Sequence, residues 1–309
     1  MQKFAEILLK GNNLAYAASG LIGLFILAYI VYNSLSYLVL KERYHGIRFT
    51  TKNIAYITMF TAVSVSVTVV ISLTVPITVF PPVRIAFEGV MVKITGFIFG
   101  PIVGVIVGLI TEALVMIFVP SFVHPAYIIV IICYGYIAGI GASFLRVGKG
   151  NNWVTLALVN IFLIGFALLM AYLIDFANLE SGIEFFGFTM SKEVFKWVFI
   201  GSVMTCIFLV WTFTIVFMAK GHNKVLNTLL PIVLFASAAE YLVTAVISAW
   251  GDYEFLGLNT GKENGVGYES GYVLMLMSRL VQAPLKIIFN SAVLYFTYKA
   301  VSPLIKTDR

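Results

Sequence analysis

Six ionisable residues lie within or at the edges of long apolar stretches of this sequence, and their chemistry suits binding. They are three cations and three carboxylates: Arg84, Glu88, Glu112, Glu240, Arg279 and Lys286. A charged side chain at the centre of a membrane helix costs on the order of 2.5–3.5 kcal/mol, so each one needs a partner or a function. Carboxylates accept hydrogen bonds from the N–H groups of a heterocycle, and Arg and Lys hold anionic groups. These residues predict a polar cavity inside an apolar protein.

The last apolar stretch shows the clearest polar pattern. At about 100° per residue, four of its side chains fall within an arc of about 80° on a helix. They are Arg279, Gln282, Lys286 and Asn290. We expect this stripe to face protein or water. With a helix rise of about 1.5 Å per residue, Glu112, Glu240 and Arg279 are expected in the outer half of the bilayer.

His124 and Tyr127 are expected at the mouth of this cavity. His124 lies in a short loop between Pro120 and Pro125, where it could bind a ligand or be a solvated loop residue. Tyr127 could stack on a flat ring or be an interfacial aromatic residue. An alternative for the charged residues is that they neutralise one another in a buried network without a ligand.

The elements that position these residues are predicted to be membrane helices. The chain has 309 residues, of which 61% are hydrophobic and 11% are charged. Soluble domains have roughly 45–50% apolar and about 25% charged residues. A soluble globular protein and a disordered chain are both excluded. The net charge of +6 is interpreted as loop topology rather than nucleic-acid binding. The two cysteines have no metal-ligand spacing, so no metal site is predicted.

Nine apolar stretches predict an all-α polytopic membrane protein. They are residues 18–40, 54–74, 83–99, 102–118, 126–145, 154–174, 197–218, 229–250 and 272–298. The third and fourth are joined by a predicted turn at Gly100 and Pro101. Ten Lys and Arg residues, including Lys220 and Lys224, gather on one side with two acids. Cytoplasmic loops are rich in Lys and Arg, so we expect the N-terminus outside and the C-terminus in the cytoplasm.

Small residues recur every fourth position on several of these helices. Thr58, Ala62 and Ser66 form one such row, and glycines form others in residues 96–108 and 135–139. Such rows let helices approach closely in lipid. They indicate packing within the chain or, for Thr58, Ala62 and Ser66, docking of another membrane subunit. Because the sequence has no phosphate-binding loop, any ATP used must be hydrolysed by another chain.

Residues 57–144 and 229–299 contain four motifs: Met59-Phe-Thr-Ala-Val-Ser64, Pro82-Val-Arg-Ile-Ala-Phe87, Gly96-Phe-Ile-Phe-Gly-Pro101 with Glu112 beyond it, and Arg279-Leu-Val-Gln-Ala-Pro284. With these motifs in this order, the two segments resemble the substrate-binding S components of energy-coupling factor (ECF) vitamin transporters. The last motif is similar to an Arg-Leu-Ile-Lys-x-Pro pattern of folate members. Gln282 departs from that pattern, and Lys286 one turn further could substitute.

The resemblance implies a six-helix core with additions. Residues 1–52 would be an extra N-terminal helix and basic linker, 53–147 core helices one to four, 148–226 an inserted hairpin, and 227–309 core helices five and six with a cytoplasmic tail. The implied binding residues are Arg84, Glu88, Glu112, His124, Tyr127, Glu240, Arg279, Gln282, Lys286 and Asn290.

The resemblance also implies partners and a function. The chain would capture a vitamin outside a bacterial plasma membrane and dock through Thr58, Ala62 and Ser66 onto a transmembrane coupling protein with two cytoplasmic ATPases. It would hold no cofactor of its own. Folate is preferred because three acids and three bases suit its two charged ends, with riboflavin and pantothenate as alternatives. The other hypotheses are an ion-coupled secondary transporter using Glu112 or Glu240, and a membrane enzyme using His124 with Glu112.

Overall fold

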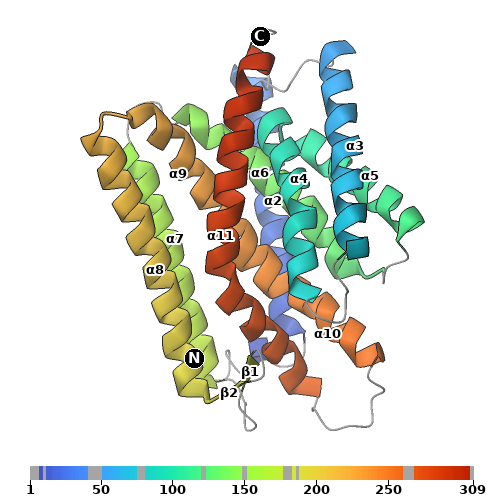
Figure 1. Ribbon diagram of the computed structural model, residues 1–309, viewed down its shortest axis with the longest axis vertical. Coiled ribbons are helices and arrows are strands. Elements are labelled where there is room, and N and C mark those ends of the chain that lie inside the picture. The colour runs from blue at the N-terminus through green and yellow to red at the C-terminus, as the bar shows by residue number, and fades with distance from the viewer. Residues whose placement is uncertain are drawn as a thin grey trace. The chain divides into compact units, whose positions relative to one another are not determined.

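The computed structural model describes residues 7–9, 12–40, 51–74, 81–119, 123–147, 152–176, 183–185, 188–259 and 268–306. Helices dominate these residues (Figure 1). The helices are α2 (Asn13–Leu40), α3 (Thr51–Thr74), α4 (Pro81–Phe99), α5 (Pro101–Phe118), α6 (Pro125–Val147), α7 (Asn152–Phe176), α8 (Lys192–Ala219), α9 (Asn223–Ala238), η1 (Ala239–Ile247), α10 (Ser248–Asn259) and α11 (Tyr268–Lys306).

The prediction of an all-α polytopic membrane protein is confirmed. Within the described ranges, 8 helical segments are long and apolar enough to cross a bilayer. The one remaining predicted stretch, residues 83–99, corresponds to α4, whose described apolar part, Gly89–Phe99, is shorter than these segments. The predicted turn between the third and fourth stretches is also confirmed. Gly100 has a φ of 101° and Pro101 occupies the first turn of α5, which suits a residue without a backbone N–H.

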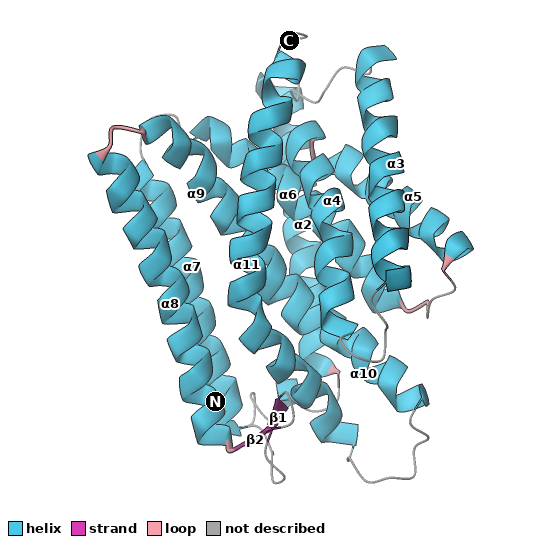
Figure 2. Ribbon diagram, viewed as in Figure 1, coloured by secondary structure: helices cyan, strands magenta, loops and turns pink. Residues whose placement is uncertain are grey.

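One short β-hairpin was not predicted. Strands β1 (Ile183–Phe185) and β2 (Phe188–Met190) pair antiparallel, with Glu184 opposite Thr189. They follow α7 and precede α8 in the chain, and Figure 2 draws them in magenta near the lower ends of these helices.

The predicted eighth stretch is part of a longer, irregular helical run. The α-helix α9 passes into a π-helix, η1, and then into α10, which extends to Asn259. Asp252 therefore lies in a helix, beyond residue 250 where the predicted eighth stretch ends. The prediction was wrong because charged residues normally end an apolar span, but the side chains of Asp252 and Glu254 are bonded to the protein itself. The π-helix matters because such segments frequently occur at functional sites.

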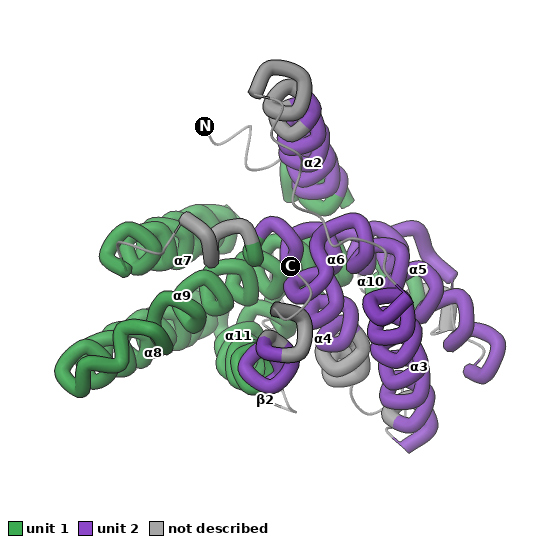
Figure 3. The backbone as a smooth tube through the Cα atoms, turned by 90° about the horizontal axis from the view of Figure 1, so that it is seen from above, with its two compact units in different colours: residues 1–15, 141–296 green, residues 16–140, 297–309 purple. Residues whose placement is uncertain are grey.

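The chain divides into two compact units (Figure 3). Unit 1 comprises residues 1–15 and 141–296, and unit 2 comprises residues 16–140 and 297–309. In unit 1, α7, α8 and α9 pack on one another, and η1 packs against α9 and α10. In unit 2, α3, α4 and α5 pack pairwise. The four-segment division expected from the sequence differs from these units and stays a prediction.

Glycines set the close approach of α4, α5 and α6 in unit 2. A Cβ atom added to Gly104 would lie 2.5 Å from the Cα of Gly96, and one added to Gly135 would lie 2.5 Å from the carbonyl carbon of Gly104. One added to Gly139 would lie 2.3 Å from the nitrogen of Pro101. These glycine rows therefore pack helices within the chain.

Substitution of Gly104 by Ala is expected to destabilise the protein by about 1–3 kcal/mol, because the added methyl group meets backbone atoms that cannot turn away. The matched control is Gly165→Ala in α7, where nothing lies within 4 Å of an added Cβ atom. Since Ala favours a helix over Gly by about 1 kcal/mol, the control should be neutral or more stable. Thermal unfolding in detergent measures both variants. Equal stability of Gly104→Ala and Gly165→Ala would contradict the packing described here.

Candidate functional site

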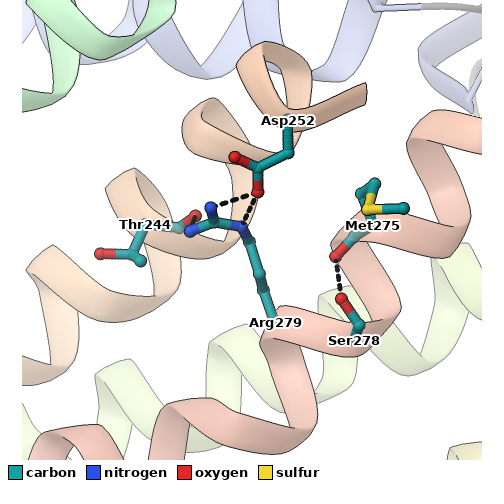
Figure 4. A network of polar contacts seen from close by, with 5 residues as sticks. All are labelled: Thr244, Asp252, Met275, Ser278 and Arg279. Carbon is teal, nitrogen blue, oxygen red and sulfur yellow. Dashed lines mark hydrogen bonds and ion pairs between the residues drawn. The ribbon is translucent and has the colours of Figure 1, made fainter. Parts of the chain in front are cut away.

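Arg279 forms a buried ion pair with Asp252, a residue that sequence reasoning did not select. Their exposed fractions are 1% and 3%. The Arg279 Nε atom donates to Asp252 Oδ2 at 2.7 Å, and Nη2 donates to the same oxygen. Its Nη1 atom donates to the carbonyl oxygen of Thr244 at 3.1 Å. Figure 4 shows the guanidinium group of Arg279 from α11 held between α10 and η1. The pair thus ties three helical segments together.

A second buried contact joins η1 to α11. Asn290 Nδ2 donates to Glu240 Oε1 at 2.7 Å, and the exposed fractions are 0% for Asn290 and 1% for Glu240. Nearer the start of α11, the Tyr272 hydroxyl donates to the carbonyl oxygen of Val246 at 2.9 Å. Two of the predicted site residues, Glu240 and Asn290, are therefore brought together, and the π-helix is fixed to α11 along its whole length.

The predicted stripe on α11 does face protein. Arg279 and Asn290 are buried and Gln282 and Lys286 are half-buried, whereas Leu285, on another face of the helix, is 74% exposed. Several polar atoms of this stripe, of η1 and of α10 are buried without a hydrogen-bond partner among the described residues. They are Gln282 Oε1, Asn290 Oδ1, the Tyr241 hydroxyl and the Ser248 hydroxyl. Each such group costs about 1–3 kcal/mol, so a polar ligand could bind here by satisfying them.

The other predicted binding residues belong to unit 2. Arg84 and Glu88 lie in α4, and their side chains fall outside the described part of the structure. Glu112 in α5 and Tyr127 in α6 are half-buried. Their roles in binding stay predictions.

His124 differs from the solvated loop residue that we considered. It is only 6% exposed, and its Nδ1 atom accepts a hydrogen bond from the backbone N–H of Ala126 at 3.2 Å. Its ring meets that of Tyr127 edge-on, with 6.2 Å between the ring centroids. His124 thus satisfies one of the free N–H groups at the start of α6.

A lysine near the end of a membrane helix usually extends its side chain to the interface, but Lys93 in α4 does not. It is fully buried, and its Nζ atom lies 4.1 Å from the centroid of the Tyr134 ring. Gly89, one turn earlier, makes room for this ring, since a Cβ atom there would lie 2.4 Å from Tyr134 Cε2. A desolvated cation–π contact is worth about 2 kcal/mol. No local sequence pattern indicates this contact, because Tyr134 lies on a different helix, α6.

The predicted docking residues lie on one face of α3. Thr58, Ala62 and Ser66 are all exposed, while Ser64 and Thr68 on another face are buried. The Thr58 hydroxyl donates to the carbonyl oxygen of Ile54 at 2.9 Å, so this face presents an essentially apolar surface. As for metals, no group of three or more His, Cys, Asp or Glu side chains that could hold an ion occurs within the described ranges.

These features define a polytopic helical membrane protein with polar groups held inside its spans. The sequence matches, over residues 48–220, the family described as ECF-type riboflavin transporter, S component. Because this match covers more than half of the chain, the chain belongs to that family. The chain is therefore a transporter subunit of the S-component class and not itself the ATPase. The resemblance to ECF S components is confirmed, whereas the folate assignment is not.

The matched region also covers most of residues 148–226, which we interpreted as an inserted hairpin. It ends before Glu240, Asp252, Arg279 and Asn290. The bonded polar network of η1, α10 and α11 therefore lies outside the matched segment.

A curated relative gives less information. The chain is 32% identical over 123 residues to a Mycoplasma pneumoniae protein named "Uncharacterized protein MG098 homolog". The alignment covers 37% of this chain and 26% of that protein, so the chain matches only about a quarter of its relative's length. No solved structure matches the chain.

Replacing one member of the buried ion pair is expected to destabilise the protein strongly. Arg279→Met or Asp252→Leu should each cost about 3–5 kcal/mol, because the remaining charge is left in an apolar interior. The double variant should recover most of this loss. Thermal unfolding in detergent measures all three variants.

The control is the exposed pair between Lys196 and Asp175, whose Nζ and Oδ2 atoms are 2.6 Å apart. Lys196→Met should cost no more than about 1 kcal/mol. If the two single variants in the buried pair were as mild as this control, or if their effects simply added in the double variant, the pair would not stabilise the fold as described.

Proposed function

We propose that this chain captures riboflavin, or a vitamin of similar uncharged ring chemistry, at the outer face of a bacterial membrane and delivers it to an ATP-driven coupling module. Membership of the family described as riboflavin S components supports the proposal. The observation that carries the choice of vitamin is the pairing of Arg279 with Asp252. The folate prediction had assigned the Arg279 side chain to a carboxylate of the ligand, but its charge is already paired with Asp252.

The remaining polar groups favour an uncharged cargo. A folate carries two carboxylates and needs cations, whereas a flavin presents an uncharged ring with N–H and C=O groups and a hydroxylated side chain. The Gln282 and Asn290 carbonyl oxygens and the Ser248 hydroxyl, each without a partner among the described residues, suit hydrogen bonds to such groups. Lys286 on the same helix face remains a proposed contact for this cargo, whereas Glu112, Arg84, Glu88, His124 and Tyr127 of unit 2 stay predictions.

The proposal includes a coupling surface on α3. The exposed row of Thr58, Ala62 and Ser66 offers a smooth face on which a helix of a transmembrane coupling protein can pack. Met59 and Val63 beside the row are 53% and 43% exposed, so larger apolar side chains extend the surface. The ATPases of the module would remain on the cytoplasmic side.

Removal of the Asn290 amide is expected to weaken vitamin binding. Asn290→Leu should raise the Kd for riboflavin about 10-fold or more, since a hydrogen-bonding group is lost from a buried site. Quenching of riboflavin fluorescence on titration with the purified chain measures the Kd. The control Leu285→Ala changes a side chain that is 74% exposed on the same helix and should leave the Kd unchanged.

A parallel titration with folate separates the two vitamins. Tighter binding of folate than of riboflavin would overturn the riboflavin assignment while leaving the S-component role in place. Failure of the folded chain to bind any B vitamin would overturn the capture function itself.

A bulky residue in the α3 row is expected to block docking. Ala62→Trp should reduce co-purification with the coupling protein several-fold, because the face can no longer approach a neighbouring helix closely. The matched control is Gly201→Trp in α8, an exposed small residue with nothing within 4 Å of an added Cβ atom. Vitamin binding by both variants should remain normal. An equal loss of co-purification in both variants would count against α3 as the docking face.

A further inference from the structure

An apolar cavity lies among four helices of unit 1. It has a volume of about 340 Å³ and is lined by residues of α7, α8, α9 and α11 (helices labelled in Figure 1). Ligand pockets in proteins range from about 300 to 1,000 Å³. Its walls are mostly aliphatic and aromatic, as Leu209, Val210, Leu226, Val233 and Ile287 illustrate, with a few hydroxyl side chains such as Ser237. The cavity is large enough to hold part of a small molecule. Its apolar walls suit an apolar group rather than a polar one.

The cavity opens on the apolar outside of the helices. Three side chains that line it, Phe213, Ile288 and Phe296, are 52%, 45% and 67% exposed. On a membrane protein, exposed apolar side chains of spanning helices face the lipid. None of the residues that we propose for vitamin binding lines the cavity. It is therefore a second site, reached from the bilayer rather than from water.

One end of the cavity lies next to a cationic turn. Phe217 in α8 and Val225 in α9 line that end. Lys220 follows Phe217 by three residues and Lys224 immediately precedes Val225, and both lysines are exposed. Residues 217–228 contain no Asp or Glu. Basic residues beside a membrane surface each attract anionic lipid by about a five-fold gain in affinity.

We propose that this cavity binds one acyl chain of an anionic glycerophospholipid, whose phosphate group contacts Lys220 and Lys224. The apolar walls match the chain, and the two lysines match the headgroup. A helix of another protein fits less well, since a helix about 10 Å across would fill the volume in less than one turn. A neutral lipid would leave the cationic end of the site unused.

Native mass spectrometry of the full chain tests the proposal. The protein is extracted from nanodiscs that contain equal amounts of phosphatidylcholine and phosphatidylglycerol, and the retained lipids are counted. The wild type should retain phosphatidylglycerol in preference to phosphatidylcholine. The double variant Lys220→Gln/Lys224→Gln should lose that preference by about 10-fold or more.

Two further variants separate the headgroup contact from the cavity. Lys192→Gln/Lys196→Gln removes the same charge from the opposite end of α8 and should behave as the wild type. Ala292→Trp, an exposed residue that lines the cavity, should reduce retention of both lipids by filling the space for the chain. A competition arm with glycerol phosphate should not displace the lipid.

Three results would overturn the proposal that the cavity binds an anionic lipid. They are equal lipid retention by all variants, an equal loss in Lys192→Gln/Lys196→Gln, or displacement by glycerol phosphate alone. Because the vitamin is absent from these measurements, failure here leaves the proposed transport function untouched.

Discussion

The buried pair of Arg279 and Asp252 is the contact on which the arrangement of η1, α10 and α11 depends. An arginine cannot lose its charge in a protein, so burying it requires a carboxylate with matching geometry and further acceptors. Asp252 supplies the carboxylate and the carbonyl oxygen of Thr244 supplies another acceptor. These two groups come from different helical segments, and Arg279 comes from a third. Moving any of the three segments would leave a charge unpaired in a medium that contains almost no water.

The π-helix η1 is also held in place by hydrogen bonds to a neighbouring helix. Within η1, the hydroxyl of Thr244 donates to the carbonyl oxygen of Ala239 at 3.2 Å, while Glu240 and Val246 are bonded to residues of α11. The widened helix therefore presents both a carboxylate and backbone carbonyl groups to one neighbour. Unit 2 uses a different principle, since glycine contacts bring α4, α5 and α6 close enough for van der Waals packing. Polar hydrogen bonds fix the arrangement of η1, α10 and α11, and close packing of small residues fixes the arrangement of α4, α5 and α6.

Much of the fold could be predicted from the sequence, because a membrane helix is recognised by the length and hydropathy of its own segment. The spans at 54–74, 102–118 and 154–174 lie within helices α3, α5 and α7. The turn at Gly100 and Pro101 was predictable because each residue has a strong local preference. The paired strands β1 and β2 and the extension of α10 past Trp250 were not predictable. The first is a mostly apolar segment too short to span a membrane, and the second contains Asp252 and Glu254, so only their bonding partners reveal the structure of both.

The candidate site shows the same difference between what a local sequence pattern predicts and what only tertiary contacts decide. The sequence by itself determined that the chain crosses a membrane many times, that charged residues are carried into that membrane, and that Arg279, Gln282, Lys286 and Asn290 share one helix face. Each of these properties follows from composition or from helical periodicity within a single segment. Only the tertiary structure decided that Arg279 bonds Asp252, that Glu240 bonds Asn290 and that Lys93 lies against Tyr134. Which charge meets which partner depends on how helices distant in the chain are brought together, and no local pattern contains that information.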